Sequence, residues 1–272
     1  MNKKGRKIKK RRLRIKVVLK ILLFLGAICA LFLYVTKLDT KNIIINGNES
    51  LKDVEIIETA GIKEYPKIYK LNLKKIENKI KKIPLIKSVD IKRDLLGRLT
   101  ITVEEKEILF YYKYNQKFIA NDKTEIDESN NIIGYPTLIN FTPDTSFKEL
   151  VNGLNKIDPN IIKMINEIEY TPYKNSEGQV IEESALYTNA RFTLYMNDSN
   201  TVIIDTVNIK RLNNYTKIYT SLNMDVTKGI LELDTINDKS EEEGETILFR
   251  SYEAVAASEA NKLAKEAQNQ GA

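Results

Sequence analysis

The sequence predicts an α+β protein with one N-terminal transmembrane helix and two folded domains behind it. Three observations support this prediction. A long apolar run lies near the N-terminus, the period of the apolar residues later changes between 3.6 and 2, and helical segments stand apart from runs of strands. Such separation is typical of α+β domains built on a mostly antiparallel sheet.

Residues 17–36 form the apolar run, whose only charged side chain is Lys20 near its start. About 20 residues in a helix that rises about 1.5 Å per residue span the roughly 30 Å apolar core of a bilayer. A cleavable signal peptide would be shorter and would end in small residues, whereas large side chains occupy positions 31–35. We therefore expect an uncleaved transmembrane helix at residues 17–37.

The tail before this helix, residues 1–16, is strongly basic and contains no acidic residue. By the positive-inside rule, this charge predicts a cytoplasmic N-terminus and an extracytoplasmic location for the rest of the chain. The same tail suits the anionic lipids of the bilayer surface. The residues that carry this topology signal are Lys9, Lys10, Arg11, Arg12, Arg14 and Lys16.

The composition argues against nucleic-acid binding and against most catalytic chemistry. The formal net charge is +6, but the first 20 residues carry eleven basic and no acidic side chains, so the remainder has a net charge of −5. A mildly acidic outer part is not expected to bind DNA or RNA, whose phosphate backbones are also negatively charged. The chain has no His, and its one cysteine, Cys29, lies in the membrane run, so the outer part lacks imidazole bases, thiolates and disulfides. We expect no enzyme, no cofactor, no metal and no small-molecule substrate.

Residues 38–106 are predicted to form a strand, two helices and two further strands. A β-rich run at 43–45 precedes a turn, and Ser50 is a suitable N-cap for the first helix. Asn72 is the expected N-cap of the second helix, which Pro84 ends. The apolar face predicted for the first helix consists of Leu51, Val54, Ile57 and Ala60.

After Pro84 the apolar residues alternate with polar ones, which is the period of a strand. The two alternating segments, 86–95 and 99–104, flank a turn at 96–98 and are expected to pair as a hairpin. The order of elements is therefore β-α-α-β-β, a three-stranded sheet with two helices on one face.

Residues 107–252 are predicted to form a second, α+β domain. Its expected elements are strands at 108–114 and 117–120, a helix capped by Ser146, a helical piece at 160–166, a strand at 168–173, a hairpin at 192–204, a helix capped by Asn208, and strands at 230–236 and 246–252. Residues 253–272 are rich in alanine and lack a clear apolar face. A lone helix of about 14 residues is marginal in water, so we expect a mobile C-terminal tail.

Several segments together resemble the FtsQ/DivIB family of bacterial cell-division proteins. After the basic tail and the membrane span come I-I-I-N-G-N-E-S-L, K-K-I-P-L-I-K-S-V-D-I-K-R and L-T-I-T-V-E-E-K, which resemble the POTRA domain of that family. Residues 118–127 resemble the segment that follows, although Thr124 stands where the family usually has Gly. N-I-K-R-L-N-N-Y-T-K-I and G-I-L-E-L-D resemble the family's last helix and the strand after it.

The resemblance implies a POTRA domain at 38–106 and a non-catalytic scaffold of the division machinery. The partners it implies are coiled-coil membrane proteins similar to FtsB/DivIC and FtsL, at the division septum. It also implies that the last strands bind a partner by strand addition, in which an exposed sheet edge pairs with an incoming strand. The candidate partner-binding residues are Ile230, Leu231, Leu233, Leu248, Phe249 and Tyr252.

Two alternatives remain open at the level of the sequence. POTRA-type domains also occur in polypeptide-transport proteins, so a translocation role is one of them. The other is a membrane-tethered cell-wall enzyme, which would need a concave pocket with converging carboxylates.

Overall fold

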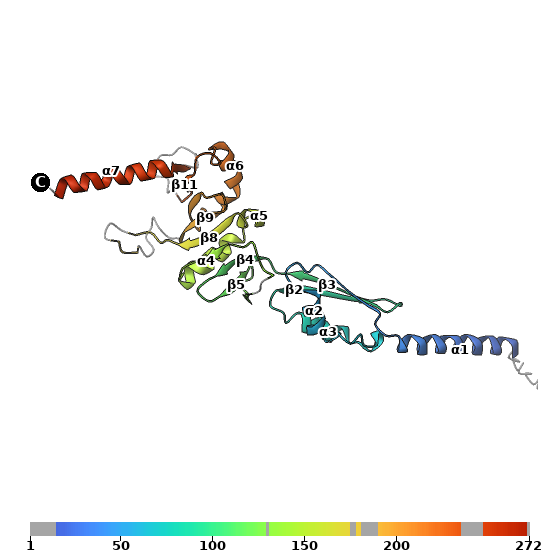
Figure 1. Cartoon of the computed structure of the whole chain (residues 1–272). Helices are drawn as coiled ribbons and strands as arrows, with labels where there is room; N and C mark the ends of the chain where they lie inside the picture. Colours follow the sequence, from blue (N-terminus) through green and yellow to red (C-terminus); the bar gives the residue numbers. More distant parts are fainter. Residues whose placement is uncertain (1–14, 129–130, 175–177, 181–189, 235–246, 271–272) are drawn as a thin grey trace, which may run out of the picture. The chain divides into compact units, whose positions relative to one another are not determined.

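The computed structural model describes residues 15–128, 131–174, 178–180, 190–234 and 247–270. The chain divides into two compact units, the first ending at Glu105 and the second beginning at Lys106 (Figure 1). Each unit has its own hydrophobic core.

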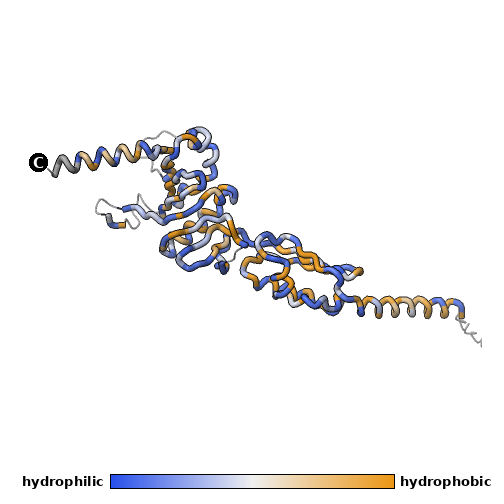
Figure 2. The backbone as a smooth tube through the Cα atoms, in the orientation of Figure 1, coloured by the Kyte–Doolittle hydropathy of each residue, from blue (hydrophilic) through white to orange (hydrophobic). Residues whose placement is uncertain are grey.

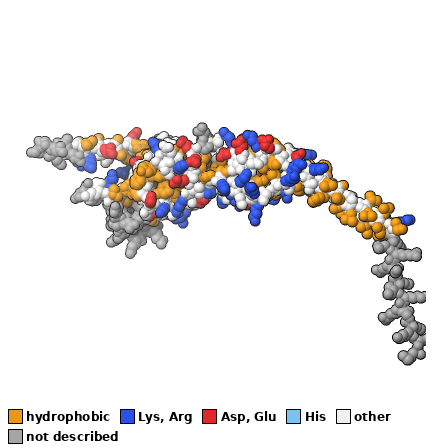
Figure 3. Space-filling view, turned by 90° about the horizontal axis from the view of Figure 1, so that it is seen from below, with side chains coloured by type: hydrophobic (Ala, Val, Ile, Leu, Met, Phe, Trp, Pro, Cys, Tyr) orange, Lys and Arg blue, Asp and Glu red, His pale blue; other side chains and the backbone are white. Residues whose placement is uncertain are grey.

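The first unit begins with the helix α1 (Ile15–Lys37), none of whose residues is buried in the protein. It is apolar along nearly its whole length (Figure 2), and in the space-filling view its apolar surface contrasts with the mixed charges of the folded parts (Figure 3). At about 1.5 Å per residue, its 23 residues extend about 34 Å. The helix is therefore long and apolar enough to cross a membrane once, as the sequence predicted.

The rest of the first unit has the predicted β-α-α-β-β order. Its three-stranded sheet has the order β1-β3-β2, in which β1 is parallel and β2 antiparallel to the central β3. The helices lie on one face of this sheet (Figure 1). The elements are β1 (Asn42–Asn46), α2 (Asp53–Ala60), the 3-10 helix η1 (Ile68–Lys70), α3 (Leu73–Ile80), β2 (Ile86–Arg93) and β3 (Arg98–Glu105).

The prediction for the start of the first helix was wrong, because a distant carboxylate occupies the preceding loop. The Glu105 carboxylate accepts hydrogen bonds from the backbone N–H groups of Glu49, Ser50 and Leu51, each at 3.0 Å. These bonds hold the loop outside the helix, so α2 begins at Asp53 instead of following a Ser50 cap. Three of the four residues predicted for the apolar face nevertheless contact the core: Ala60 is buried, and Leu51 and Ile57 pack against it while partly exposed.

One residue of the predicted face of α2 was wrong, and one core residue was missed. Val54, which the sequence placed on the apolar face, is 60% exposed, whereas Ile56 is fully buried. The cap predicted for the next helix is confirmed, since the Asn72 side chain accepts a hydrogen bond from the backbone N–H of Lys75 at 3.0 Å.

The second unit contains a nine-stranded sheet in the order β12-β11-β10-β9-β8-β7-β4-β5-β6. Its described strand pairs are antiparallel except at β4–β7, β7–β8 and β10–β11, which confirms the mostly antiparallel α+β prediction. The strands are β4 (Ile108–Tyr112), β5 (Lys117–Ala120), β6 (Glu125–Asp127), β7 (Thr137–Leu138), β8 (Ile165–Tyr170), β9 (Arg191–Met196), β10 (Thr201–Asp205), β11 (Gly229–Glu232) and β12 (Leu248–Ser251).

The first two helices of this unit have other bounds than the sequence predicted. The first follows Pro143 and not Ser146, and the helical piece that follows ends before Ile165 because β8 already begins there. The 3-10 helix that follows β10 begins directly after Asn208, as predicted, but the Asn208 side chain makes no cap; its amide instead donates to Asp205 at 3.1 Å. The helices are α4 (Asp144–Leu154), α5 (Pro159–Ile162), the 3-10 helix η2 (Ile209–Asn214), α6 (Tyr215–Ser221) and α7 (Tyr252–Gln270).

Candidate functional site

The strand β12 is the outermost strand at one end of the nine-stranded sheet. Its inner edge pairs antiparallel with β11, with Leu248 opposite Glu232 and Ser251 opposite Gly229. In the sheet of the described residues, no further strand lies beyond it. An edge of this kind presents unpaired backbone groups to another chain.

The backbone groups of Phe249 and Ser251 point toward this free edge. The N–H of Tyr252 donates to the carbonyl of Lys228 at 3.1 Å, so this pair of residues is hydrogen-bonded across β11 and β12. Opposite residues of an antiparallel pair alternate between hydrogen-bonded and non-hydrogen-bonded positions. The backbone groups at 250 and 248 therefore face β11, and those at 249 and 251 face outward.

A glycine allows β12 to lie this close to its neighbour. A Cβ atom on Gly229 would lie 2.2 Å from the carbonyl oxygen of Arg250 and 2.9 Å from the Cα of Ser251. The N–H of Gly229 donates at 3.0 Å to the side chain of Asn200, which is buried. This glycine is thus fixed on one side by a hydrogen bond and on the other by the backbone of β12.

The six predicted partner-binding residues lie close together, but they do not all face solvent. Leu231 and Leu233 are fully buried in the hydrophobic core, so their side chains are not accessible to a partner. Phe249 lies opposite Leu231 and packs against the same core, while remaining partly exposed.

The outer face of this strand pair carries Ile230, Glu232, Leu248 and Arg250. Leu248 is 41% exposed, and Arg250 forms an ion pair with Glu232 on the neighbouring strand. Leu248 can therefore contact an incoming strand. Because Arg250 and Glu232 neutralise each other, such a contact would not bury an unpaired charge. Leu248, Tyr252, which is 39% exposed, and the backbone edge are therefore the most accessible parts of the predicted site, and Ile230 is partly exposed.

The start of α7 attaches to the same end of the sheet. The Tyr252 hydroxyl donates to the carbonyl of Ser199 at 3.1 Å and lies 2.8 Å from the Thr201 hydroxyl. The hydroxyl of Ser251 accepts a hydrogen bond from the N–H of Ala254 at 3.2 Å, which satisfies one of the free donors of the first helical turn. The segment predicted as a tail is thus helical through Gln270 and is attached at its first turn.

A buried polar network holds the segment after β11, and no sequence pattern indicated it. Asp234, which is almost fully buried, accepts hydrogen bonds from Arg191 at 2.6 Å and from the Tyr173 hydroxyl at 3.1 Å. Burial, with the carboxylates of Asp234 and Asp205, raises the pKa of Tyr173 above its ordinary value. These residues are 43 and 61 positions from Asp234, so no local pattern could reveal the contact.

The basic residues of the topology signal lie mainly outside the described part of the chain. This holds for Lys9, Lys10, Arg11, Arg12 and Arg14, whereas Lys16 lies in the first turn of α1. The acidic run at 241–243 is also outside the described residues.

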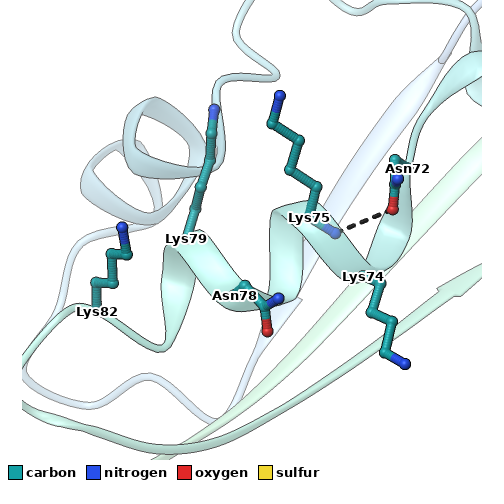
Figure 4. Close-up of a pocket in the computed structure, with 6 residues that line it drawn as sticks. All are labelled: Asn72, Lys74, Lys75, Asn78, Lys79 and Lys82. Carbon is teal, nitrogen blue, oxygen red and sulfur yellow. Dashed lines mark hydrogen bonds between the residues drawn. The ribbon is translucent and has the colours of Figure 1, made fainter.

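A shallow depression of about 500 Å³ lies on the surface of α3. Four lysines and two asparagines line it, and they do not converge on a common point, since Lys74 points away from Lys75 (Figure 4). Lys79 donates to the carbonyl of Ala60 at 3.3 Å. Without a carboxylate among its lining residues, this depression has no acid–base pair. No group of three or more potential metal-binding side chains occurs among the residues that the structure describes.

The fold and the edge together define a class: a protein with one helix long and apolar enough to span a membrane, one POTRA-type domain and a sheet domain that ends in an open strand. A family model described as "POTRA domain, FtsQ-type" matches residues 38–106, and one described as "Cell division protein FtsQ/DivIB, C-terminal" matches residues 115–236. The chain belongs to the FtsQ/DivIB family of cell-division proteins, which confirms the resemblance found in the sequence. The strand β12 lies beyond the matched residues.

Curated relatives and a solved structure carry the same family name. The cell division protein DivIB of Bacillus cytotoxicus is 29% identical over 162 residues, which are 58% of this chain and 59% of that protein. DivIB of Bacillus subtilis (strain 168) is 26% identical over 239 residues, 85% of this chain and 84% of that protein. The major extracytoplasmic domain of the trans isomer of DivIB from Geobacillus stearothermophilus aligns with a TM-score of 0.32 and 19% identity, over 45% of this chain and 98% of that one.

Proposed function

We propose that this protein is a non-catalytic scaffold of the division machinery that binds other single-span division proteins outside the membrane. The observation that carries the proposal is the free outer edge of β12 in a member of a cell-division family. By resemblance, the partners are coiled-coil membrane proteins similar to FtsB/DivIC and FtsL. The proposed role is to coordinate septum formation and septal peptidoglycan synthesis.

The proposed orientation places the N-terminus in the cytoplasm and both units outside, because the basic residues lie before α1. Anchoring in one membrane raises the effective concentration of the partners without any new contact. Several weak interactions, including strand addition at β12, then suffice for a stable complex. We propose the division septum as the site where this complex assembles.

Imaging of a fluorescent fusion at the N-terminus tests the proposed role, since this tag leaves both outer units free. The expected result is a band at the division site that persists through constriction, together with a septation defect when the protein is depleted. A uniform signal around the envelope with normal septation after depletion would contradict the scaffold role and favour a transport or enzymatic one.

Strand addition predicts a specific effect of proline at the free edge. Ser251→Pro removes an N–H that faces outward and leaves the bonds between β12 and β11 intact, because proline is tolerated where the N–H of an edge strand faces solvent. Loss of one interchain hydrogen bond is expected to weaken co-purification with the FtsB/DivIC-like partner by about tenfold.

Ser251→Ala is the matched control, since it removes the hydroxyl that accepts from Ala254 but keeps the outward N–H. It is expected to bind as the parent chain does. If both variants weakened partner binding equally, the cause would be the lost hydroxyl at the start of α7. That result would contradict pairing through the backbone.

A further inference from the structure

The hairpin that joins β2 to β3 exposes two neighbouring leucines at its tip. Leu95 is 74% exposed and Leu96 is 65% exposed. Single exposed leucines are common on protein surfaces. Two in succession on a projecting turn form a small apolar surface that nothing in the first unit covers among its described residues.

The turn that carries these leucines is held in one conformation. The carboxylate of Asp94 accepts hydrogen bonds from the N–H groups of Leu96 and Arg98, both at 2.8 Å, and from the Arg98 guanidinium at 2.7 Å. The N–H of Asp94 donates to the carbonyl of Arg98 at 3.0 Å, which closes the hairpin. Gly97 adopts a φ of +88°, a conformation that glycine adopts without strain. The outward position of the leucines is therefore built into the turn.

The same tip is bonded to the segment that leaves the membrane helix. The N–H of Lys41 donates to the carbonyl of Gly97 at 2.8 Å, and a Cβ atom on Gly97 would lie 2.9 Å from the carbonyl oxygen of Asp39. Because α1 ends at Lys37, the tip lies beside residues two to four positions past the end of the span. Figure 1 shows the turn between β2 and β3 at the end of the domain where α1 joins it.

This exit segment is itself fixed on the domain and does not act as a loose linker. The N–H of Ile68 donates to the carbonyl of Leu38 at 3.1 Å, and the N–H of Thr40 donates to the carbonyl of Pro66 at 3.2 Å. Leu38 is buried. The hairpin tip, the exit segment and the loop before η1 therefore form one end of the first unit.

The charges at this end suit a membrane surface. Exposed lysines occur at 37, 41, 67 and 70, on the exit segment and beside η1, with Asp39 as an acidic neighbour. Arg93 is directed inward, where its guanidinium lies 5.1 Å from the centre of the Tyr69 ring and donates to the carbonyl of Ile68. An apolar tip surrounded by lysines matches a bilayer interface, where leucines enter the acyl boundary and lysines remain at the headgroups.

We propose that the tip of the β2–β3 hairpin inserts Leu95 and Leu96 into the leaflet from which α1 emerges. This insertion gives the first unit a second membrane contact besides the transmembrane helix. Two points of attachment restrict the orientation of the domain relative to the bilayer more than the transmembrane helix alone would.

The test uses the full chain reconstituted in vesicles, with an environment-sensitive fluorophore at one engineered cysteine. Cys29→Ala removes the only native thiol, and Leu96→Cys places the label at the tip. The expected result is blue-shifted emission, with quenching by lipid-borne nitroxides at least about threefold stronger than at a control site outside the membrane. Leu95→Ser in the same labelled chain is expected to reduce this lipid quenching.

Val54→Cys provides the distant control. Val54 is 60% exposed near the start of α2, beside the far end of β3, and the eight residues of that strand span about 23 Å. Lys70→Cys provides a control near the membrane but on the polar rim. Lipid quenching at 96 that is no stronger than at 54 or at 70 would overturn the proposal.

Two lipid compositions separate the apolar from the electrostatic contribution. In vesicles of phosphatidylcholine alone, the label at 96 is expected to remain in contact with lipid, because insertion depends on the leucines. Phosphatidylglycerol is expected to strengthen the contact through the lysines. Lipid quenching at 96 that appears only with phosphatidylglycerol and is unchanged by Leu95→Ser would overturn insertion by the leucines.

Discussion

Removal of residues 246–272 is expected to reduce binding of the FtsB/DivIC-like partner on the order of a hundredfold or more. This deletion removes the whole of β12 with its outward backbone groups, and it also removes Phe249 from the core of the second unit. The first unit should stay folded, since its core contains no residue of the second unit. Co-purification from detergent-solubilised membranes measures the loss of binding, and limited proteolysis of the first unit measures its folding.

Removal of residues 253–272 alone is the matched control for this deletion. It eliminates nearly all of α7 but leaves β12 and the Tyr252 hydroxyl bonded to Ser199. Binding close to that of the full chain is expected. If the shorter deletion abolished binding as completely as the longer one, α7 and not the strand edge would be the binding element. Full binding by the longer deletion would contradict the proposed site altogether.

Gly229→Ala is expected to displace β12 without removing any residue of it. The added Cβ would meet backbone atoms of Arg250 and Ser251 at 2.2–2.9 Å, and backbone atoms of a paired strand cannot move aside as a flexible side chain can. Insertion of one carbon into such a contact costs about 1–3 kcal/mol. A four-residue strand attached through one neighbour has little stability of its own, so we expect β12 and the start of α7 to detach from β11.

Hydrogen exchange at residues 247–254 provides the direct measurement, and loss of partner binding should accompany the faster exchange. Gly134→Ala is the control, because it makes the same change in the same unit at a position with no atom within 4 Å of the new Cβ. It should leave β12 protected, despite the strain at its φ of +80°. Unchanged protection in Gly229→Ala would contradict the role assigned to this glycine.

The elements that could be predicted from the sequence are those set by local pattern. The apolar run that became α1, the cap at Asn72, and the hairpin of β2 and β3 each depend on residues a few positions apart. Their spacing directly reflects helix and strand geometry. The family resemblance depended on the order of such segments and was likewise available from the sequence.

The wrong prediction at Ser50 has a cause that no local pattern reveals, which is a long-range contact that competes with the local cap. Ser50 is a good N-cap by type, but the carboxylate of Glu105, 55 residues away, binds its N–H and keeps it outside the helix. Asn208 directly precedes η2, as predicted, but its side-chain amide and its N–H both donate to Asp205, only three residues before it, and its side chain makes no cap. Local propensity cannot rank the alternatives at Ser50, because the competing carboxylate of Glu105 arrives only when the chain folds.

The candidate binding site shows which features the sequence determined and which depended on the tertiary structure. The sequence by itself determined that the last apolar segments form strands and that their leucines and aromatics are candidates for contact. Only the tertiary structure decided that Leu231 and Leu233 lie in the core while Leu248 faces outward, and that Gly229 must lack a side chain. A strand's alternation defines two faces but not which of them is covered, and that choice depends on the pairing of strands and the packing of helices from distant parts of the chain.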